Sequence, residues 1–256
     1  MKKTIILSLM LSALFLTARA DGPGNESLAY DVMFKWGLIN KNAGHVTIDT
    51  SIENDGTFSS VLVGKSATWA DKFYTVRDTL RSRIELDGLK PVYYEKISHE
   101  GGEFKKDIIT YQHNGNTVTA NCERYQQKKA NKPVVHSTKM LTANGYTVDM
   151  LASFYYMRYL DYSSMTPGQS VTMNIFSGKR KEILHITYQG QQPVNLKNIN
   201  HNCYYITFSF TSEIDGKEKT SDDLFAWIST EPDRIPLKLQ GKLPVGVVRC
   251  FYTGEL

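Results

Sequence analysis

Cysteine is scarce in this sequence of 256 residues, which contains three: Cys122, Cys203 and Cys250. An odd number leaves at least one thiol unpaired within the chain. We expect any disulfide to join Cys203 and Cys250, because both lie in the C-terminal half. The six histidines and three cysteines show no spacing typical of a metal site. We therefore expect neither a metal nor another cofactor.

Catalytic motifs are also missing. The sequence has no G-x-S-x-G nucleophile elbow and no H-E-x-x-H pair. Gly64-Lys65-Ser66 lacks the upstream glycine of a phosphate-binding loop. We expect a protein that is not an enzyme. A hydrolase of unrecognised type is the remaining alternative, which a cleft with two carboxyl groups of shifted pKa would favour.

Long hydrophobic runs are absent except at the N-terminus. There, Lys2 and Lys3 precede the apolar run Ile5–Leu16. Ala18-Arg19-Ala20 then supplies the small residues that a signal peptidase recognises. The apolar run is shorter than the roughly 20 residues that a membrane-spanning helix needs. We predict that residues 1–20 are a signal peptide and that the mature chain has no transmembrane segment; an uncleaved anchor is the alternative.

Excess positive charge is small once the signal peptide is removed. The full chain carries 30 basic and 26 acidic residues, a net charge of +4. Lys2, Lys3 and Arg19 leave with the signal, so 27 basic residues remain and the net charge falls to +1. This balance does not favour nucleic acid as a partner. Ala20 is followed by Asp21 rather than by a lipid-anchor cysteine, so we predict an exported protein that is soluble after cleavage.

The mature chain is rich in signals for antiparallel β structure. After a flexible leader at residues 21–27, residues 28–256 are predicted to form a single β-rich domain. In the segment His45–Asp49, apolar and polar residues alternate strictly, which is typical of a strand. Tight hairpins are predicted wherever Asp-Gly or Asn-Gly separates two such segments. The four pairs are Asp55-Gly56, Asp87-Gly88, Asn114-Gly115 and Asp215-Gly216.

One segment, Asp149–Asp161, predicts a helix instead. It contains no glycine or proline, and Asp149 is a suitable N-cap. The segment is apolar almost all round, so the helix should be buried. The predicted fold is mainly β: a curved antiparallel sheet or half-open barrel around one central buried helix.

Arg158 is the most informative residue of this helix. A buried charge without a partner costs several kcal/mol, so Arg158 needs a partner or access to water. One interpretation is a structural ion pair with a strand carboxylate, or an aliphatic stem that reaches out to water. The other is a pocket in which Arg158 meets an anionic head group, with Phe154 and Tyr155 lining an apolar cavity.

The candidate ligand-binding residues come from this helix and from one early turn. Leu151, Phe154, Tyr155 and Arg158 share one face at 100° per residue. Trp36 precedes a glycine-containing turn, where an exposed ring would suit stacking on a ligand and a packed ring would be structural.

The chain resembles a family of exported bacterial proteins known as domain of unknown function 3108. Several short signatures in order carry the resemblance: Trp36-Gly37, Ala43-Gly44, Leu89–Tyr94, Gly101-Gly102, Val148–Ser153, Tyr155–Arg158, Trp227–Ser229, Arg234–Leu237 and Pro244–Gly246. The resemblance implies a Gram-negative, periplasmic protein. It supplies no activity and no catalytic residues.

These observations lead to two main hypotheses. The first is a non-enzymatic binding or carrier domain for an apolar or lipid-like ligand, held between a curved sheet and the helix. The second is a structural module of the cell envelope that docks on a protein or a glycan. A cavity of several hundred Å³ would favour the first, and a filled barrel with an exposed apolar patch would favour the second.

Overall fold

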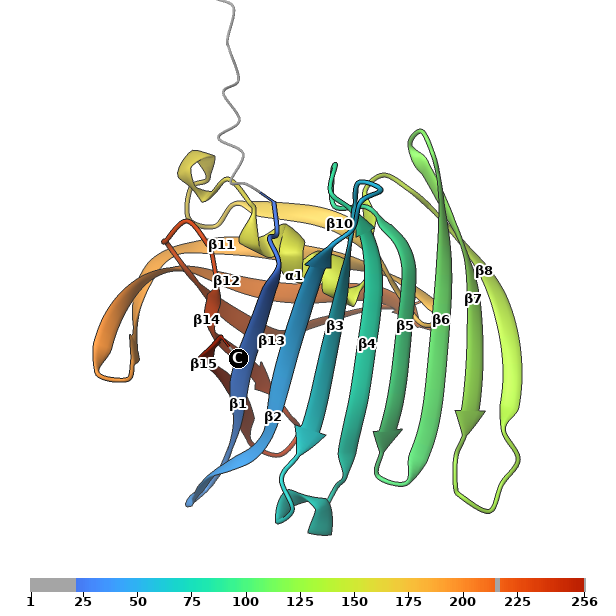
Figure 1. The fold of residues 1–256 in the computed structure, drawn as a ribbon, viewed down its shortest axis with the longest axis horizontal. Helices are drawn as coiled ribbons and strands as arrows, with labels where there is room; N and C mark the ends of the chain where they lie inside the picture. The colour runs from blue at the N-terminus through green and yellow to red at the C-terminus, as the bar shows by residue number, and fades with distance from the viewer. Residues whose placement is uncertain (1–21, 215–216, 256) are drawn as a thin grey trace, which may run out of the picture.

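The computed structural model describes residues 22–214 and 217–255, and the predicted signal peptide lies outside this range. Within it, fifteen strands form one strongly curved sheet, a nearly closed barrel with one short α-helix inside (Figure 1). The predicted mainly β fold with a central buried helix is confirmed. No helix among the described residues is long and apolar enough to cross a membrane.

The strands fall into two groups along the chain, before and after the helix. The first group is β1 (Glu26–Trp36), β2 (Ile39–Ile52), β3 (Thr57–Ser66), β4 (Val76–Glu85), β5 (Pro91–Glu100), β6 (Glu103–Asn114), β7 (Thr117–Gln127), β8 (Val135–Asn144) and β9 (Thr147–Val148). The second group is β10 (Ser170–Ser177), β11 (Arg180–Leu196), β12 (Ile199–Ile214), β13 (Lys217–Ser229), β14 (Pro236–Lys242) and β15 (Val247–Glu255).

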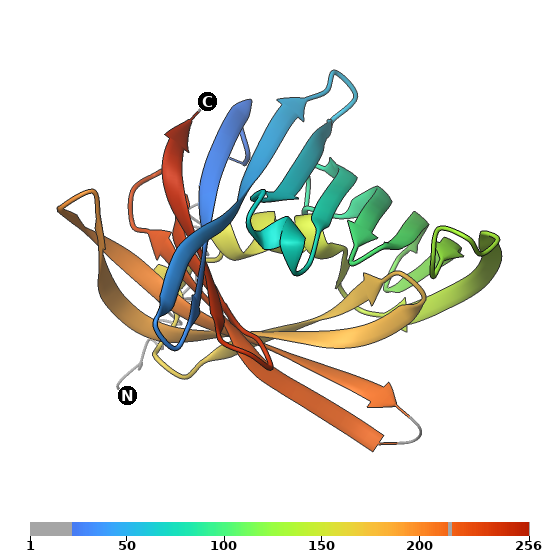
Figure 2. The ribbon, with the colours of Figure 1, turned by 90° about the horizontal axis from the view of Figure 1, so that it is seen from below.

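The order of the strands explains how the sheet encloses a space. It runs β8-β7-β6-β5-β4-β3-β2-β1-β15-β14-β13-β12-β11-β10-β9, so the first and last strands pair at its centre. Both edges come from the middle of the chain. All pairs are antiparallel except β9 with β10. Figure 2 shows the two halves of the sheet as opposed layers with the helix between them.

Three of the four predicted hairpin turns lie in the described residues and connect paired strands as expected. Gly56, Gly88 and Gly115 have φ angles of 80°, 74° and 58°, in the left-handed region that glycine adopts without strain. The fourth, Asp215-Gly216, lies outside the described residues. The predicted leader is too long, because β1 already begins at Glu26.

The predicted disulfide is wrong. Cys203 and Cys250 are both free thiols, as is Cys122. Cys203 lies on β12 and Cys250 on β15, with β13 and β14 between them in the sheet. Neighbouring strands lie about 4.8 Å apart, so three such steps exceed the roughly 7 Å that a disulfide can span between Cα atoms.

The helix α1 (Met150–Arg158) is shorter than predicted, and Tyr159 is its C-cap. Asp149 caps it as expected, accepting hydrogen bonds from the backbone N–H groups of Leu151 (2.7 Å) and Ala152 (2.8 Å). Two short 3₁₀ helices, η1 (Ala70–Lys72) and η2 (Tyr162–Ser164), complete the regular elements of the described residues.

Asp149 also fixes the start of the helix to the sheet. Its carboxylate is fully buried and accepts a hydrogen bond of 2.6 Å from the Ser82 hydroxyl on β4. Burial raises the pKa of Asp149 to about 6, although the hydrogen bonds from Ser82 and the backbone act in the opposite direction. The cap is therefore an ionisable group whose charge the surrounding core disfavours.

We predict that Asp149 gives the protein a pH-dependent stability. Between about pH 4 and pH 6 the folded state binds more protons at Asp149 than the unfolded state, whose pKa is near 3.8. Its contribution to the free energy of unfolding therefore falls as the pH rises through this window, by about 3 kcal/mol in total.

The Asp149→Asn variant keeps a capping oxygen but cannot ionise, so it isolates this contribution. Urea unfolding of both proteins at several pH values gives the difference in unfolding free energy, in which the other titrating groups cancel. We expect the wild type to lose stability relative to the variant between pH 4 and pH 7. A difference that stays constant over this range would show that Asp149 does not titrate there.

Candidate functional site

The helix α1 has two faces with different environments. One face is held against the strands β1–β4. On this face, Tyr155 forms hydrogen bonds through its hydroxyl with Ser60 on β3 (2.8 Å) and Thr50 on β2, and Leu151 and Arg158 are buried beside it. The other face consists of Met150, Ser153, Phe154 and Met157, a spacing of i, i+3, i+4 and i+7 that forms one stripe on a helix. These four residues line a cavity, which is called the main cavity below.

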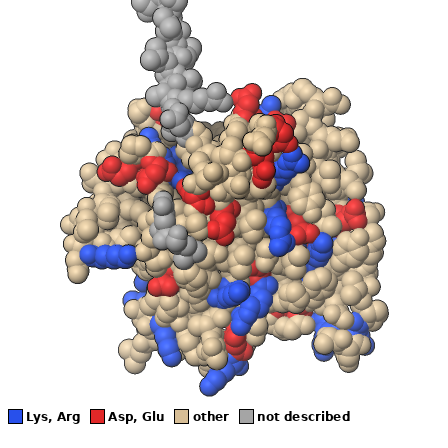
Figure 3. Space-filling view, in the orientation of Figure 1, with Lys and Arg blue, Asp and Glu red and all other residues tan. Residues whose placement is uncertain are grey.

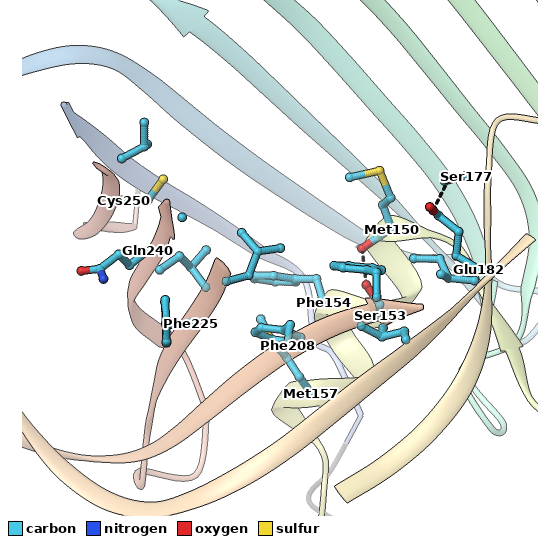
Figure 4. Close-up of a pocket in the computed structure, with 17 residues that line it drawn as sticks. Met150, Ser153, Phe154, Met157, Ser177, Glu182, Phe208, Phe225, Gln240 and Cys250 are labelled. Atoms are coloured by element: carbon cyan, nitrogen blue, oxygen red, sulfur yellow. Dashed lines mark hydrogen bonds between the residues drawn. The ribbon is translucent and has the colours of Figure 1, made fainter. Parts of the chain in front are cut away.

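The cavity lies between this second face of α1 and the half of the sheet formed by β10–β15 (Figure 4). Its volume is about 680 Å³, within the range of about 300–1,000 Å³ found for small-molecule sites. In Figure 4, Phe154 and Met157 of the helix lie close to Phe208 of β12. Apolar strand residues make up most of the remaining wall, among them Ile175, Leu184, Phe210, Leu239 and Val248.

The few polar side chains of the cavity wall already have partners. Glu182 accepts a hydrogen bond of 2.8 Å from Ser177, and Ser153 donates one of 2.8 Å to the Met150 carbonyl. Gln240 accepts one of 3.1 Å from Arg249. An occupant would therefore meet a mainly apolar surface, with polar groups at a few points.

Part of this apolar surface is not covered by the protein itself. Phe208 and Phe210 are only half-buried, although both line the cavity. Met150 and Leu224, which also line it, are exposed. The cavity therefore reaches the solvent beside Met150 and Leu224.

Arg158 does not line this cavity. Its guanidinium group binds both carboxylate oxygens of Glu26 on β1, one of them at 2.9 Å, and donates a further hydrogen bond of 2.9 Å to the Asp233 carbonyl. The side chains of Arg158 and Glu26 are 1% and 12% exposed. Burial opposes the charge of Arg158, but the hydrogen bonds and negative charge of Glu26 outweigh it and raise the pKa of Arg158.

The structure therefore corrects the hypothesis that Arg158 binds a ligand head group. It forms the structural ion pair with a strand carboxylate that was the alternative interpretation. Sequence reasoning missed Glu26 because the residue was assigned to the leader. The guanidinium group also lies near the rings of Phe154, Tyr155 and Tyr159, with its central carbon 5.6–5.7 Å from the ring centroids.

The predicted ligand-binding residues are thus separated into three environments. Phe154 lines the main cavity, whereas Leu151, Tyr155 and Arg158 lie on the anchored face of the helix and do not line it. Trp36 is exposed and lines a second cavity of about 590 Å³ at one end of the barrel.

Sequence reasoning missed the residues that build most of the main cavity. The stripe of Met150, Ser153 and Met157 beside Phe154 could have been found on the same helical wheel. In the sequence, however, the charge of Arg158 favours the other face of the helix as a binding face. The strand residues carried no comparable signal, since alternating apolar positions are equally typical of a filled core.

Two carboxyl groups of shifted pKa occur elsewhere, on β4 and β5. Asp78 and Glu100 each lie 3.3 Å from the Lys96 ammonium group. Burial is the largest cause that raises the pKa of Asp78, and a hydrogen bond with Glu100 is the next. The pKa of Glu100 is lowered, because its contacts with Asp78 and Lys96 outweigh the effect of its burial. Neither residue lines the two cavities described above, and the arrangement is that of an ion-pair network. No group of three or more His, Cys, Asp or Glu among the described residues is placed to hold a metal ion.

We predict that Arg158→Met lowers the free energy of unfolding by about 3–5 kcal/mol, because it leaves the Glu26 carboxylate buried without its partner. Urea unfolding measures this loss. The double variant Glu26→Gln with Arg158→Met should recover a large part of it, since no unpaired charge remains.

Arg83→Met is the matched control, because Arg83 pairs with Asp55 at the surface, where both side chains are about half exposed. It should cost less than about 1 kcal/mol. Equal losses for Arg158→Met and Arg83→Met would contradict the assignment of Arg158 to a buried structural pair.

Comparisons with known proteins identify the family and support the fold. A crystal structure of a β-barrel-like protein of domain of unknown function DUF1849 from Brucella abortus is similar, with a TM-score of 0.61 and 8% sequence identity. The match covers 91% of this chain and 98% of that one, and at this identity it shows the fold alone. No curated protein matches the sequence. A family model described as protein of unknown function DUF3108 matches residues 29–251, so the chain belongs to the DUF3108 family.

Proposed function

We propose that this protein is a non-enzymatic binding or carrier domain for an apolar or lipid-like ligand, exported to the periplasm. The observation that carries the proposal is the cavity of about 680 Å³ between α1 and the strands β10–β15. The N-terminal signal pattern supports export. The ligand would occupy the space beside Phe154 and Phe208.

The side chains that line the main cavity indicate which class of ligand would bind there. Partly exposed aromatic and aliphatic side chains gain about 25 cal/mol for each Å² of apolar surface that a ligand covers. No Lys or Arg side chain is among the described residues that line the cavity, so nothing there would select an anion. The polar groups of Glu182 and Ser153 are already hydrogen-bonded. A long apolar body with a small polar end fits these features best.

One observation favours the alternative, a structural module that docks on an envelope protein or glycan. The edge strand β8 and the residue before it expose three apolar side chains, Val134, Val135 and Met140. An edge strand can also pair with a strand of another chain. Docking there requires no internal ligand, so ligand binding discriminates between the two functions.

We predict that N-phenyl-1-naphthylamine, an apolar probe that fluoresces when it leaves water, binds in the main cavity. The Ser153→Phe variant places a large ring on the helix face that lines the cavity. It should weaken probe binding by about tenfold or more, because the added ring occupies space that the probe needs. Fluorescence titration measures the dissociation constant.

Ser51→Phe on β2 is the control, because it makes the same chemical change at an exposed position outside the cavity. Its affinity for the probe should equal that of the wild type. Absence of probe binding to the wild type, or equal weakening by both variants, would contradict the carrier function and leave the docking module as the better account.

A further inference from the structure

One end of the barrel presents a group of apolar side chains to the solvent. They come from the end of β1, the start of β2 and the turn between them, from the residue after η1, and from the turn between β14 and β15. Figure 1 shows the first two segments at the lower end of the molecule. The group, called the apolar rim below, consists of Trp36, Leu38, Ile39, Phe73, Leu243 and Val245.

The apolar rim is strongly exposed. The side chain of Leu38 is fully exposed, that of Phe73 is 83% exposed and that of Trp36 is 56% exposed. Trp36, Phe73 and Val245 line the same cavity of about 590 Å³, so residues far apart in the sequence meet at this end. An exposed apolar patch of this kind marks an interaction site.

Exposed basic side chains lie near the apolar rim in the fold. Lys35, Lys41, Lys72 and Lys242 are exposed on or next to the segments that form it, and exposed Lys65 on β3 lines the cavity behind it. Figure 3 shows Lys and Arg side chains along the lower edge of the visible face. Asp71 of η1 is held in an ion pair with Arg77, with a nitrogen–oxygen distance of 2.6 Å, so its charge is compensated. This end of the molecule therefore combines exposed apolar side chains with exposed lysines.

This combination matches the surface of a bilayer that contains anionic phospholipid. Tryptophan and other large apolar side chains favour the boundary between head groups and acyl chains. Lysines beside them gain from the negative potential of the lipid surface. A protein partner with an apolar groove would use the aromatic side chains but would gain nothing from the lysines unless it were also acidic.

The cavity behind the apolar rim adjoins the main cavity. Val248 and Cys250 of β15 line both. We propose that the apolar rim docks this protein on anionic phospholipid bilayers, so that an apolar ligand passes between the membrane and the main cavity along β15. Docking on a bilayer is inferred from the apolar rim and its lysines alone, whereas the passage of ligand depends on the proposed carrier function.

The test is co-sedimentation of the purified protein with vesicles of phosphatidylcholine alone and with vesicles that also contain about one third phosphatidylglycerol. Mass spectrometry first verifies that the chain starts at Asp21, because a retained signal segment would itself bind lipid. The wild type should bind the phosphatidylglycerol vesicles more tightly, and added salt should weaken this binding because it screens the lysines.

Two variants separate the apolar and the charged contributions. The double variant Leu38→Ser with Leu243→Ser should weaken binding to the phosphatidylglycerol vesicles by about tenfold or more. The double variant Lys35→Gln with Lys72→Gln should weaken this binding by about fivefold for each lysine removed. None of these four residues lines either cavity, so binding of N-phenyl-1-naphthylamine in solution should stay unchanged. Probe binding thereby reports on the carrier function independently of docking.

The control is Val135→Ser with Met140→Ser on β8, where the wild-type side chains are 62% and 63% exposed. This variant should bind vesicles as the wild type does. Failure of the wild type to bind phosphatidylglycerol vesicles would overturn the proposal and make a protein the better candidate for the apolar rim. Equal weakening by the rim variant and the β8 variant would overturn it as well.

Discussion

The buried ion pair between Arg158 and Glu26 is the contact on which the arrangement of the interior depends. It joins the last turn of α1 to β1, which lies at the centre of the sheet and pairs with β15. Removing either partner would leave the other charged group in the core, which is unfavourable by several kcal/mol. The end of the helix is therefore fixed to the strand where the two halves of the sheet meet.

Two further contacts fix the rest of the helix on the same side. Asp149 accepts a hydrogen bond from Ser82 on β4, and the Tyr155 hydroxyl binds Ser60 on β3. Together with the Arg158–Glu26 pair, these contacts lie against the strands β1–β4. Because all three draw α1 toward one half of the sheet, a space remains between its opposite face and the strands β10–β15. The cavity is thus a consequence of how the helix is anchored.

Much of the fold could be predicted from local signals. The turns at Gly56, Gly88 and Gly115 require positive φ angles, and Asp-Gly and Asn-Gly pairs in the sequence predict such turns. The role of Asp149 as the N-cap of the helix could also be predicted from the sequence. The pairing of β1 with β15 could not be predicted, because hydrogen bonds between strands about 220 residues apart leave no local pattern.

The site was harder to predict than the fold for a physical reason. A buried arginine on a helix indicates that a partner exists but does not indicate whether the partner is a ligand or another part of the chain. Here the partner is Glu26, in a segment whose glycines and proline suggested a leader. The stripe of Met150, Ser153, Phe154 and Met157 looks like core packing in the sequence, and Phe154 and Met157 do belong to the core. Only the tertiary structure shows that the same stripe also lines a cavity.

The central claim is that anchoring α1 to the strands β1–β4 creates a cavity that holds an apolar ligand. Native mass spectrometry of the protein, purified from its own envelope fraction without organic solvent, tests this claim most directly. We expect a population with a bound adduct that organic solvent extracts and that contains an apolar chain. A single species at the mass of the polypeptide alone, in preparations that still bind no added fatty acid or phospholipid, would contradict the claim.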